Sequence, residues 1–150
     1  MELTQVQIDT AVRLVVAAAM GAAVGAEREL HEHAAGLRTH LLVAVGSCLF
    51  TLVSAYGFEA FSGATDPSRV AAQIVTGIGF LGAGAILREG LTVHGLTTAA
   101  SLWVVAAIGM AVALGLFWAS GIAVAITIVS LWPLRPFRRR LRLRRESQGG

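Results

Sequence analysis

Arginine, glutamine and closely spaced glycines interrupt an otherwise apolar stretch between residues 66 and 109 of this sequence. Arg69 and Gln73 are four residues apart, which places them on one face of a helix. Polar side chains and helix breakers persist at bilayer depth only where they face protein or a water-filled cavity. Their chemistry is that of binding a polar or ionic partner inside a membrane, so we expect this stretch to be the working centre of the protein.

The glycines of the same stretch leave two interpretations open. Gly77, Gly79, Gly82 and Gly84 either let another helix backbone pack closely, or mark a broken helix whose freed backbone groups form a binding site. The first three also fit the spacing GxGxxG. A dinucleotide fingerprint requires a preceding strand in a soluble βαβ unit, so this interpretation is rejected.

Other reactive side chains give weaker signals. His31, Glu32 and His33 lie in a charged connector, but their spacing matches no closed four-ligand metal site. Cys48 is the only cysteine, which excludes an internal disulfide. No nucleophile and base pair stands out, so we expect neither an enzyme nor a metal site nor a cofactor. Whether Mg²⁺ binds directly is left open.

Composition indicates an integral membrane protein. Apolar residues make up 55% of the 150 residues and charged residues only 14%, with a mean hydropathy of +0.71. So few charged side chains cannot cover a soluble domain of this length. The uncharged run from residue 96 to 132 is too long for one membrane span and sufficient for two.

The pattern of apolar runs and start signals predicts an all-α membrane protein, a five-span transmembrane helical bundle over residues 1–134. Asp66 and Pro67 form a helix start, Thr97 or Thr98 caps the next helix, residues 88–95 form a turn, and a tight turn lies near Gly115. The predicted helices cover residues 9–26, 39–57, 67–87, 98–114 and 117–132.

Three spacings predict how the first two helices face their neighbours. Asp9 and Arg13 are one turn apart and able to pair. Gly21 and Gly25 form a GxxxG face for the close approach of another helix. A polar stripe on the second helix points into the bundle, and its members are His40, Ser47, Thr51 and Ser54.

Arginine determines the expected orientation. With the C-terminus in the cytoplasm, ten of the twelve arginines lie inside, and only Arg13 and Arg69 lie outside. The cytoplasmic tail, residues 135–150, is expected to bind anionic lipid rather than nucleic acid, because no soluble nucleic-acid-binding fold accompanies it. The expected lipid-binding residues are Arg138, Arg139, Arg140, Arg142, Arg144 and Arg145.

Four segments together resemble the transmembrane domain of the MgtC/SapB family of bacterial inner-membrane proteins: residues 25–29, 35–50, 66–90 and 95–115. The resemblance implies a role in adaptation to magnesium limitation and, in pathogens, in survival inside host cells. It also implies that such proteins modulate other membrane proteins instead of carrying magnesium. Many relatives add a soluble ACT-like domain at the C-terminus, and none is expected here because this sequence stops after its basic tail.

The family's polar signature implies a set of functional residues. They are Glu27, Arg28, Glu29, Arg38, Thr39, Asp66, Arg69, Gln73, Arg88, Glu89, Thr97 and Thr98. Under the expected topology, Glu27, Glu29, Arg38, Arg88 and Glu89 lie at the cytoplasmic end, where they form a functional ion-pair network or merely neutralise one another. Asp66 and Arg69 lie at the outer end, with Gln73 deeper.

Two functions remain open. One is a regulatory, homo-oligomeric membrane protein that binds partner membrane proteins through small-residue faces. The other is an ion or small-solute transporter with Gln73 and the glycine run at its permeation site. The absence of a recognisable inverted repeat favours the regulator.

Overall fold

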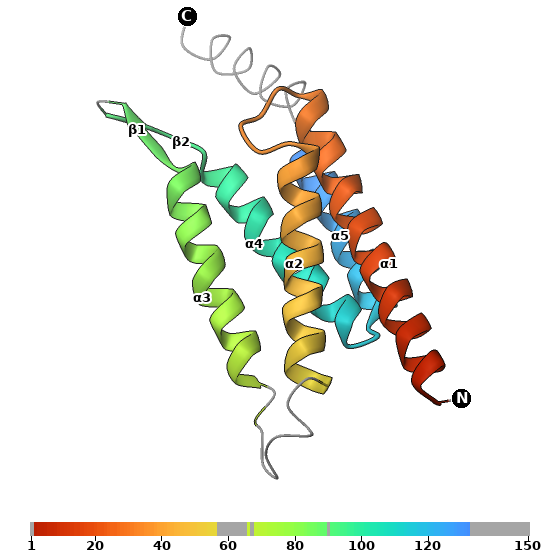
Figure 1. The fold of residues 1–150 in the computed structure, drawn as a ribbon. Coiled ribbons are helices and arrows are strands. Elements are labelled where there is room, and N and C mark those ends of the chain that lie inside the picture. The colour runs from red at the N-terminus through yellow and green to blue at the C-terminus, as the bar shows by residue number, and fades with distance from the viewer. Residues whose placement is uncertain (1, 57–65, 67, 90, 133–150) are drawn as a thin grey trace, which may run out of the picture.

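Five helices and one short hairpin make up the part of the chain that the computed structural model describes, residues 2–56, 66, 68–89 and 91–132. The elements are α1 (Glu2–Leu30), α2 (Leu37–Tyr56), α3 (Ser68–Ala85), β1 (Leu87–Glu89), β2 (Thr92–His94), α4 (Leu96–Ala113) and α5 (Phe117–Leu131). Successive helices run in alternating directions, so the start of α1 and the end of α5 lie at opposite ends of the bundle (Figure 1). The described chain is mainly helical, as the predicted all-α class requires.

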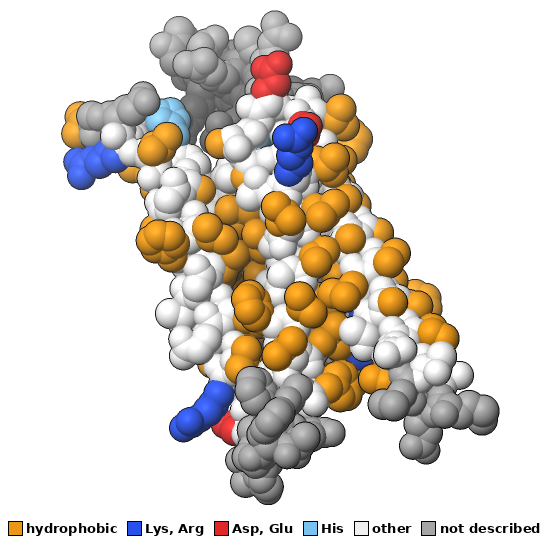
Figure 2. Space-filling model, viewed as in Figure 1, with side chains coloured by type: hydrophobic (Ala, Val, Ile, Leu, Met, Phe, Trp, Pro, Cys, Tyr) orange, Lys and Arg blue, Asp and Glu red, His pale blue; other side chains and the backbone are white. Residues whose placement is uncertain are grey.

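Within the described part of the chain, three helices are long and apolar enough to cross a membrane: the segment Thr4–Leu30 of α1, together with α2 and α4. Helix α5 is apolar but shorter. Figure 2 shows hydrophobic side chains over the middle of the visible face and charged side chains toward its two ends. This distribution is that of a protein whose apolar surface contacts lipid. The prediction of five spans stays a prediction.

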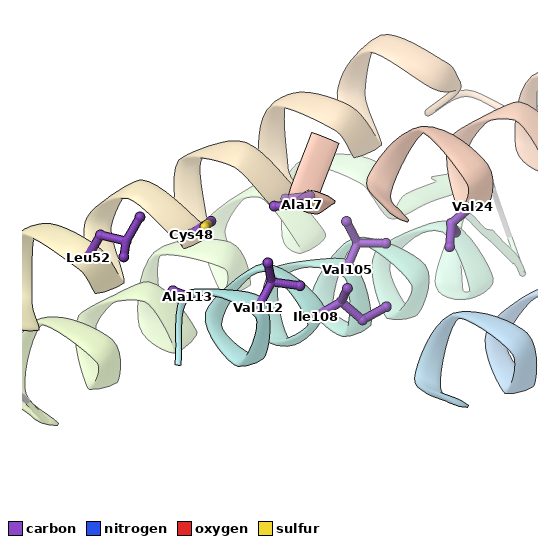
Figure 3. Close-up of a cluster of buried hydrophobic side chains, with 9 residues drawn as sticks. Ala17, Val24, Cys48, Leu52, Val105, Ile108, Val112 and Ala113 are labelled. Atoms are coloured by element: carbon purple, nitrogen blue, oxygen red, sulfur yellow. The ribbon is translucent and has the colours of Figure 1, made fainter. Parts of the chain in front are cut away.

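The core lies where α1, α2 and α4 meet. Its buried side chains include Ala17, Val24, Cys48 and Val105, all fully inaccessible to solvent (Figure 3). Because these side chains are small, the helices approach closely enough for backbone contact. A Cβ atom on Gly109 would lie 2.3 Å from the carbonyl oxygen of Ala44. Close packing around small residues therefore stabilises this part of the bundle.

The predicted faces of the first two helices are confirmed. A Cβ on Gly21 would lie 2.6 Å from that of Ala44, and one on Gly25 would lie 2.7 Å from the Cα of Leu37. The stripe of His40, Ser47, Thr51 and Ser54 is buried.

An ion pair links two turns of α1 and reaches the far end of α4. Arg13 pairs with Asp9 at 2.7 Å, as its spacing predicted. The same guanidinium donates a hydrogen bond to the carbonyl oxygen of Ala113, in the last turn of α4. A cation there also interacts favourably with the negative end of the helix dipole. Beyond it, Gly115 adopts a φ of 78° and forms the tight turn predicted near this residue.

Three expectations about α3 and α4 are wrong. The expected turn over residues 88–95 contains an antiparallel hairpin in which Arg88 pairs with Val93. Since its strand β1 begins at Leu87, α3 ends at Ala85 instead of 87. Helix α4 is preceded by Gly95 with φ 87° and no side-chain cap, so neither Thr97 nor Thr98 caps it. Of the two interpretations left open for the α3 glycines, the broken helix is not observed, because α3 is one continuous helix from Ser68 to Ala85.

We expect Gly109→Ala to destabilise the bundle, because its Cβ would overlap the α2 backbone. Overpacking of this kind typically costs about 1–3 kcal/mol. The control is Gly46→Ala, since a Cβ at Gly46 meets nothing within 4 Å. Thermal unfolding of the detergent-solubilised protein should show a lower Tm for Gly109→Ala only. Equal Tm values for the two variants would contradict this account of the α2 and α4 contact.

Candidate functional site

A buried arginine joins α1 to α4 at one end of the bundle. Arg28 lies in the last turn of α1 and is 2% exposed. Its Nη2 donates a hydrogen bond of 3.0 Å to the Oγ1 of Thr98, in the first turn of α4. Placing a cation at the C-terminal end of α1 is also favourable for the helix dipole. Arg28 and Thr98, both predicted as functional residues, are thus brought together.

A second polar link joins α2 to α4 beside the first. The Nε2 of His40, which is fully buried, lies 3.0 Å from the Oγ of Ser101. The Nδ1 of the same ring lies 2.9 Å from the carbonyl oxygen of Gly36, and the Ser101 hydroxyl lies 2.8 Å from the carbonyl oxygen of Thr98. A carbonyl only accepts, so Nδ1 carries the proton that goes to Gly36. When the His40 ring is neutral, Nε2 is an acceptor for the Ser101 hydroxyl. The single hydroxyl proton of Ser101 can then go either to Nε2 of His40 or to the carbonyl oxygen of Thr98.

A buried carboxylate completes this polar cluster. Glu27 is 9% exposed, and neither of its carboxylate oxygens has a hydrogen-bond partner among the described residues. The Nδ1 of His31 lies 3.2 Å from its Oε1, a contact that is an ion pair only when the imidazole is protonated. Buried carboxylates normally have partners, so Glu27 is the member of the cluster with unused acceptor capacity.

Other predicted residues at this end have separate roles. The Oε2 of Glu29 accepts a hydrogen bond of 2.7 Å from the backbone N–H of Leu37 and so helps to begin α2. Arg38 is exposed and makes no ion pair with any residue that the structure describes. Among the described residues, no ion pair joins Arg38 to Glu27 or Glu29, and the five-residue network expected at this end stays a prediction. Arg88 and Glu89 lie on β1, in the hairpin that projects at this end of the bundle (Figure 1).

Gln73 lies away from the buried cluster, in an open groove between α2 and α3. The groove has a volume of about 630 Å³ and is lined mainly by apolar side chains. Arg38 and Thr39 line it as well, near the start of α2. Thr97, also predicted, lines a smaller cavity of about 390 Å³ between α4 and α5. Four of the predicted residues, Arg38, Thr39, Gln73 and Thr97, thus line surface cavities and not the buried cluster.

The α3 glycines differ in their surroundings. Only Gly82 faces a neighbour, with its Cβ position 3.6 Å from the Cβ of Ala99 on α4. A Cβ on Gly77, Gly79 or Gly84 would meet nothing within 4 Å. The interpretation as close packing within this chain therefore applies to Gly82 alone.

Asp66 and Arg69 lie at the opposite end of the bundle. The carboxylate of Asp66 accepts hydrogen bonds from the hydroxyl and the backbone N–H of Ser68, at 2.6 and 2.9 Å. These bonds, the hydroxyl first, hold the pKa of Asp66 below its usual value, and Arg69 acts in the same direction. A carboxyl with a lowered pKa stabilises the fold above its unfolded pKa, and the effect is lost as pH falls through the folded pKa. Asp66 thus anchors the start of α3 at neutral pH, and its full exposure keeps the effect small.

Sequence reasoning did not include His40 and Ser101 among the site residues. Both were detectable as polar side chains within apolar runs, and His40 belonged to the predicted stripe. Their pairing across 61 residues of sequence required the structure. The expected lipid-binding arginines, 138 to 145, lie outside the described residues. Within the described ranges, no three His, Cys, Asp or Glu side chains form a group that could hold a metal ion.

Comparison with known proteins identifies the family. The MgtC family model matches residues 14–140. This chain belongs to the MgtC family. No solved structure matches it.

Several relatives within the MgtC family are similar over most of this chain. The putative magnesium transporter YhiD of Escherichia coli K12 is 50% identical over 110 residues, which are 71% of this chain and 51% of YhiD. Protein MgtC of Brucella abortus is 46% identical over 127 residues, 85% of this chain and 52% of that protein. Protein MgtC of Salmonella typhimurium is 49% identical over 118 residues, 79% of this chain and 48% of that protein. The chain thus spans about half the length of these relatives.

We expect Thr98→Val to destabilise this MgtC-family domain, because the buried Arg28 guanidinium would lose an acceptor. Leaving a buried charged donor unsatisfied costs about 1–3 kcal/mol. The matched control is Thr97→Val, because Thr97 is the exposed neighbour of the buried Thr98. Thermal unfolding in detergent should show a lower Tm for Thr98→Val than for Thr97→Val. If the two variants unfold together, the Arg28 to Thr98 hydrogen bond contributes nothing to stability.

Proposed function

We propose that this MgtC-family chain is a regulatory membrane protein that binds other integral membrane proteins in adaptation to magnesium limitation and, in a pathogen, in intracellular survival. The outward face of α3 is the strongest support. Ala72, Thr76, Gly79 and Ala83 are spaced by four, three and four residues, so they form one stripe along the helix. All four are exposed.

This stripe, the α3 outer face, suits another transmembrane helix. Small side chains let two helix backbones approach closely, and close packing drives helix association in lipid. Phe80, which borders the stripe, is 81% exposed. A large aromatic side chain beside this stripe of small side chains provides an apolar contact around which a partner helix can pack. The α3 outer face therefore offers both the close approach and the contact area that a protein partner needs.

The bundle interior supports binding more than passage. Where α1, α2 and α4 meet, the middle of the protein is filled by apolar side chains such as Ala44, Leu52 and Val112. At the end of the bundle, Arg28 and His40 are engaged in links between helices. Polar groups used in this way hold helices together, whereas a transporter needs them free along a path.

The proposed setting is the bacterial inner membrane, crossed five times. The N-terminus lies outside and the C-terminus in the cytoplasm, because arginine is concentrated at that end of the sequence. We propose further that the chain forms homo-oligomers, and that the arginines of residues 138–145 bind anionic lipid at the cytoplasmic surface.

A second candidate is a transporter of ions or small solutes. Two observations favour it: the E. coli relative carries the name putative magnesium transporter, and Gln73 places an amide in the groove between α2 and α3. Under this alternative, Gln73 belongs to the transport site and the chain moves its substrate without a partner protein.

We expect Gly79→Leu to abolish complementation of growth at low magnesium in a strain that lacks its own MgtC-family protein. A Cβ at Gly79 meets nothing within 4 Å in this chain, and the residue is exposed, so folding and abundance should be preserved while a partner helix is kept away. The control is Gly121→Leu on α5, where a Cβ also meets nothing within 4 Å, and this variant should complement fully.

Liposomes that contain only the purified protein separate the two functions. A regulator should move no Mg²⁺ across the membrane. Magnesium flux through the wild-type protein that is lost in Gln73→Ala would establish the transporter instead. Full complementation by Gly79→Leu would remove the α3 outer face from the mechanism.

We expect a topology reporter fused after Gly150 to read cytoplasmic and one inserted at Gly63 to read external. The physical basis is the concentration of arginine near the cytoplasmic ends of the spans. Alkaline phosphatase and green fluorescent protein fusions provide opposite readouts for each position. Both positions on the same side of the membrane would rule out five spans.

A further inference from the structure

The groove between α2 and α3 has the shape and chemistry of a site for one long apolar chain. Its walls include Leu42 and Phe50 from α2 and Ile74, Ile78 and Leu81 from α3. Its volume of about 630 Å³ falls within the range of ligand pockets, roughly 300–1,000 Å³. Neither wall closes over the groove, so a molecule can enter sideways from the surrounding lipid.

Among the residues that line the groove, Arg38 is the one charged side chain, and it lies at the end of the groove near the start of α2. Arg38 and Thr39 lie in the first turn of α2, which begins at Leu37. Arg13 and Arg28 are each hydrogen-bonded within the bundle, whereas Arg38 has no ion-pair partner among the described residues. The N-terminus of α2 is already occupied by the Glu29 carboxylate, which accepts the Leu37 N–H. The Arg38 guanidinium and the Thr39 hydroxyl therefore supply the groups that favour an anion at the mouth of the groove.

The length of the groove matches one leaflet of a bilayer. From Arg38 to Phe50, α2 advances about 18 Å at 1.5 Å per residue. Half of a typical hydrocarbon core is about 15 Å thick. A chain that begins at Arg38 and follows the apolar walls would therefore end near the bilayer centre.

A helix from another protein fits this groove less well. An α-helix with its side chains is about 10 Å in diameter, so it would lie across the open side of the groove and not within it. An uncharged helix would also leave Arg38 without a counter-charge at the membrane surface. Simple cations are disfavoured, because Gln73 and Ser47 are the only uncharged polar side chains lining the groove beyond Thr39.

We propose that the α2–α3 groove binds one acyl chain of an anionic phospholipid, with Arg38 and Thr39 holding the phosphate of its headgroup. None of the residues that line this groove belongs to the α3 outer face or to the arginines at 138–145. Gly77 lines the groove, whereas Gly79, two residues further along the helix, lies on the opposite side.

Two glycine substitutions on the same helix provide the test. A Cβ on either Gly77 or Gly79 meets nothing within 4 Å, so a leucine at either position should leave the fold intact. Gly77→Leu fills the groove, and Gly79→Leu adds the same side chain on the other face. Both are made in a full-length chain whose six arginines between residues 138 and 145 are replaced by glutamine, which removes lipid bound at the tail.

Native mass spectrometry of protein purified in mild detergent counts the phospholipids that remain bound. We expect one phosphatidylglycerol on the parent and on Gly79→Leu, and none on Gly77→Leu. Arg38→Gln should retain lipid but prefer phosphatidylglycerol over phosphatidylethanolamine about fivefold less than the parent, since one basic residue contributes about that factor.

Equal lipid retention by Gly77→Leu and Gly79→Leu would overturn the proposal, because the lipid would then lie outside the groove. An unchanged headgroup preference in Arg38→Gln would overturn the role given to Arg38. Lipid retention is measured on purified protein, whereas partner binding is tested separately by complementation with Gly79→Leu. Failure of one proposal is thus distinguishable from failure of the other.

Discussion

A guanidinium buried between helices fixes how α1, α2 and α4 meet. Removing an arginine from water costs several kcal/mol, which hydrogen bonds must offset. Arg28 donates one such bond to Thr98, and its Nε is buried without a hydrogen-bond partner among the described residues. His40 and Ser101 form a parallel link beside it. Apolar contacts are non-directional and tolerate sliding, whereas a shift of one residue at this end would leave a buried charge without its acceptor. The polar end therefore sets the register of α1, α2 and α4 relative to one another.

Glycine and this polar cluster depend on each other. A Cβ on Gly21 would lie 2.8 Å from the carbonyl oxygen of His40, and one on Gly25 would lie 3.0 Å from the Cβ of His40. The two glycines of α1 thus let the helix approach the very turn of α2 that carries the buried imidazole. If α1 were held further away, water could reach His40 and Arg28, and their links would contribute less in the more polar surroundings. The close packing at Gly21 and Gly25 and the buried hydrogen bonds of Arg28 and His40 therefore depend on the same approach of α1 to α2.

The features that depend on residues close together in the sequence were predicted correctly. Apolar runs and helix spacing were sufficient for the helical class, for the Asp9 to Arg13 pair and for the inward stripe on α2. The partner of Arg28 was not predictable, because Thr98 is 70 residues away and its hydroxyl had been assigned to a helix cap. The hairpin was also missed, since it has strands of three residues. The glycines of α3 illustrate the same limit of sequence analysis. The sequence shows that α3 has small residues on its surface, but only the structure shows which glycine contacts another helix.

Helix α3 stands apart from the rest because it buries so little of itself. Only Ile78 and Gly82 are buried along its length, so much of its surface is available to molecules outside the chain. An acyl chain in the groove would occupy the space between α2 and α3 and set their separation. A ligand shifts a conformational equilibrium only by its differential affinity for the two arrangements. Lipid that binds only when the groove is open would therefore hold the α3 outer face in one position. Partner recognition on one side of α3 would then depend on the lipid bound to its other side.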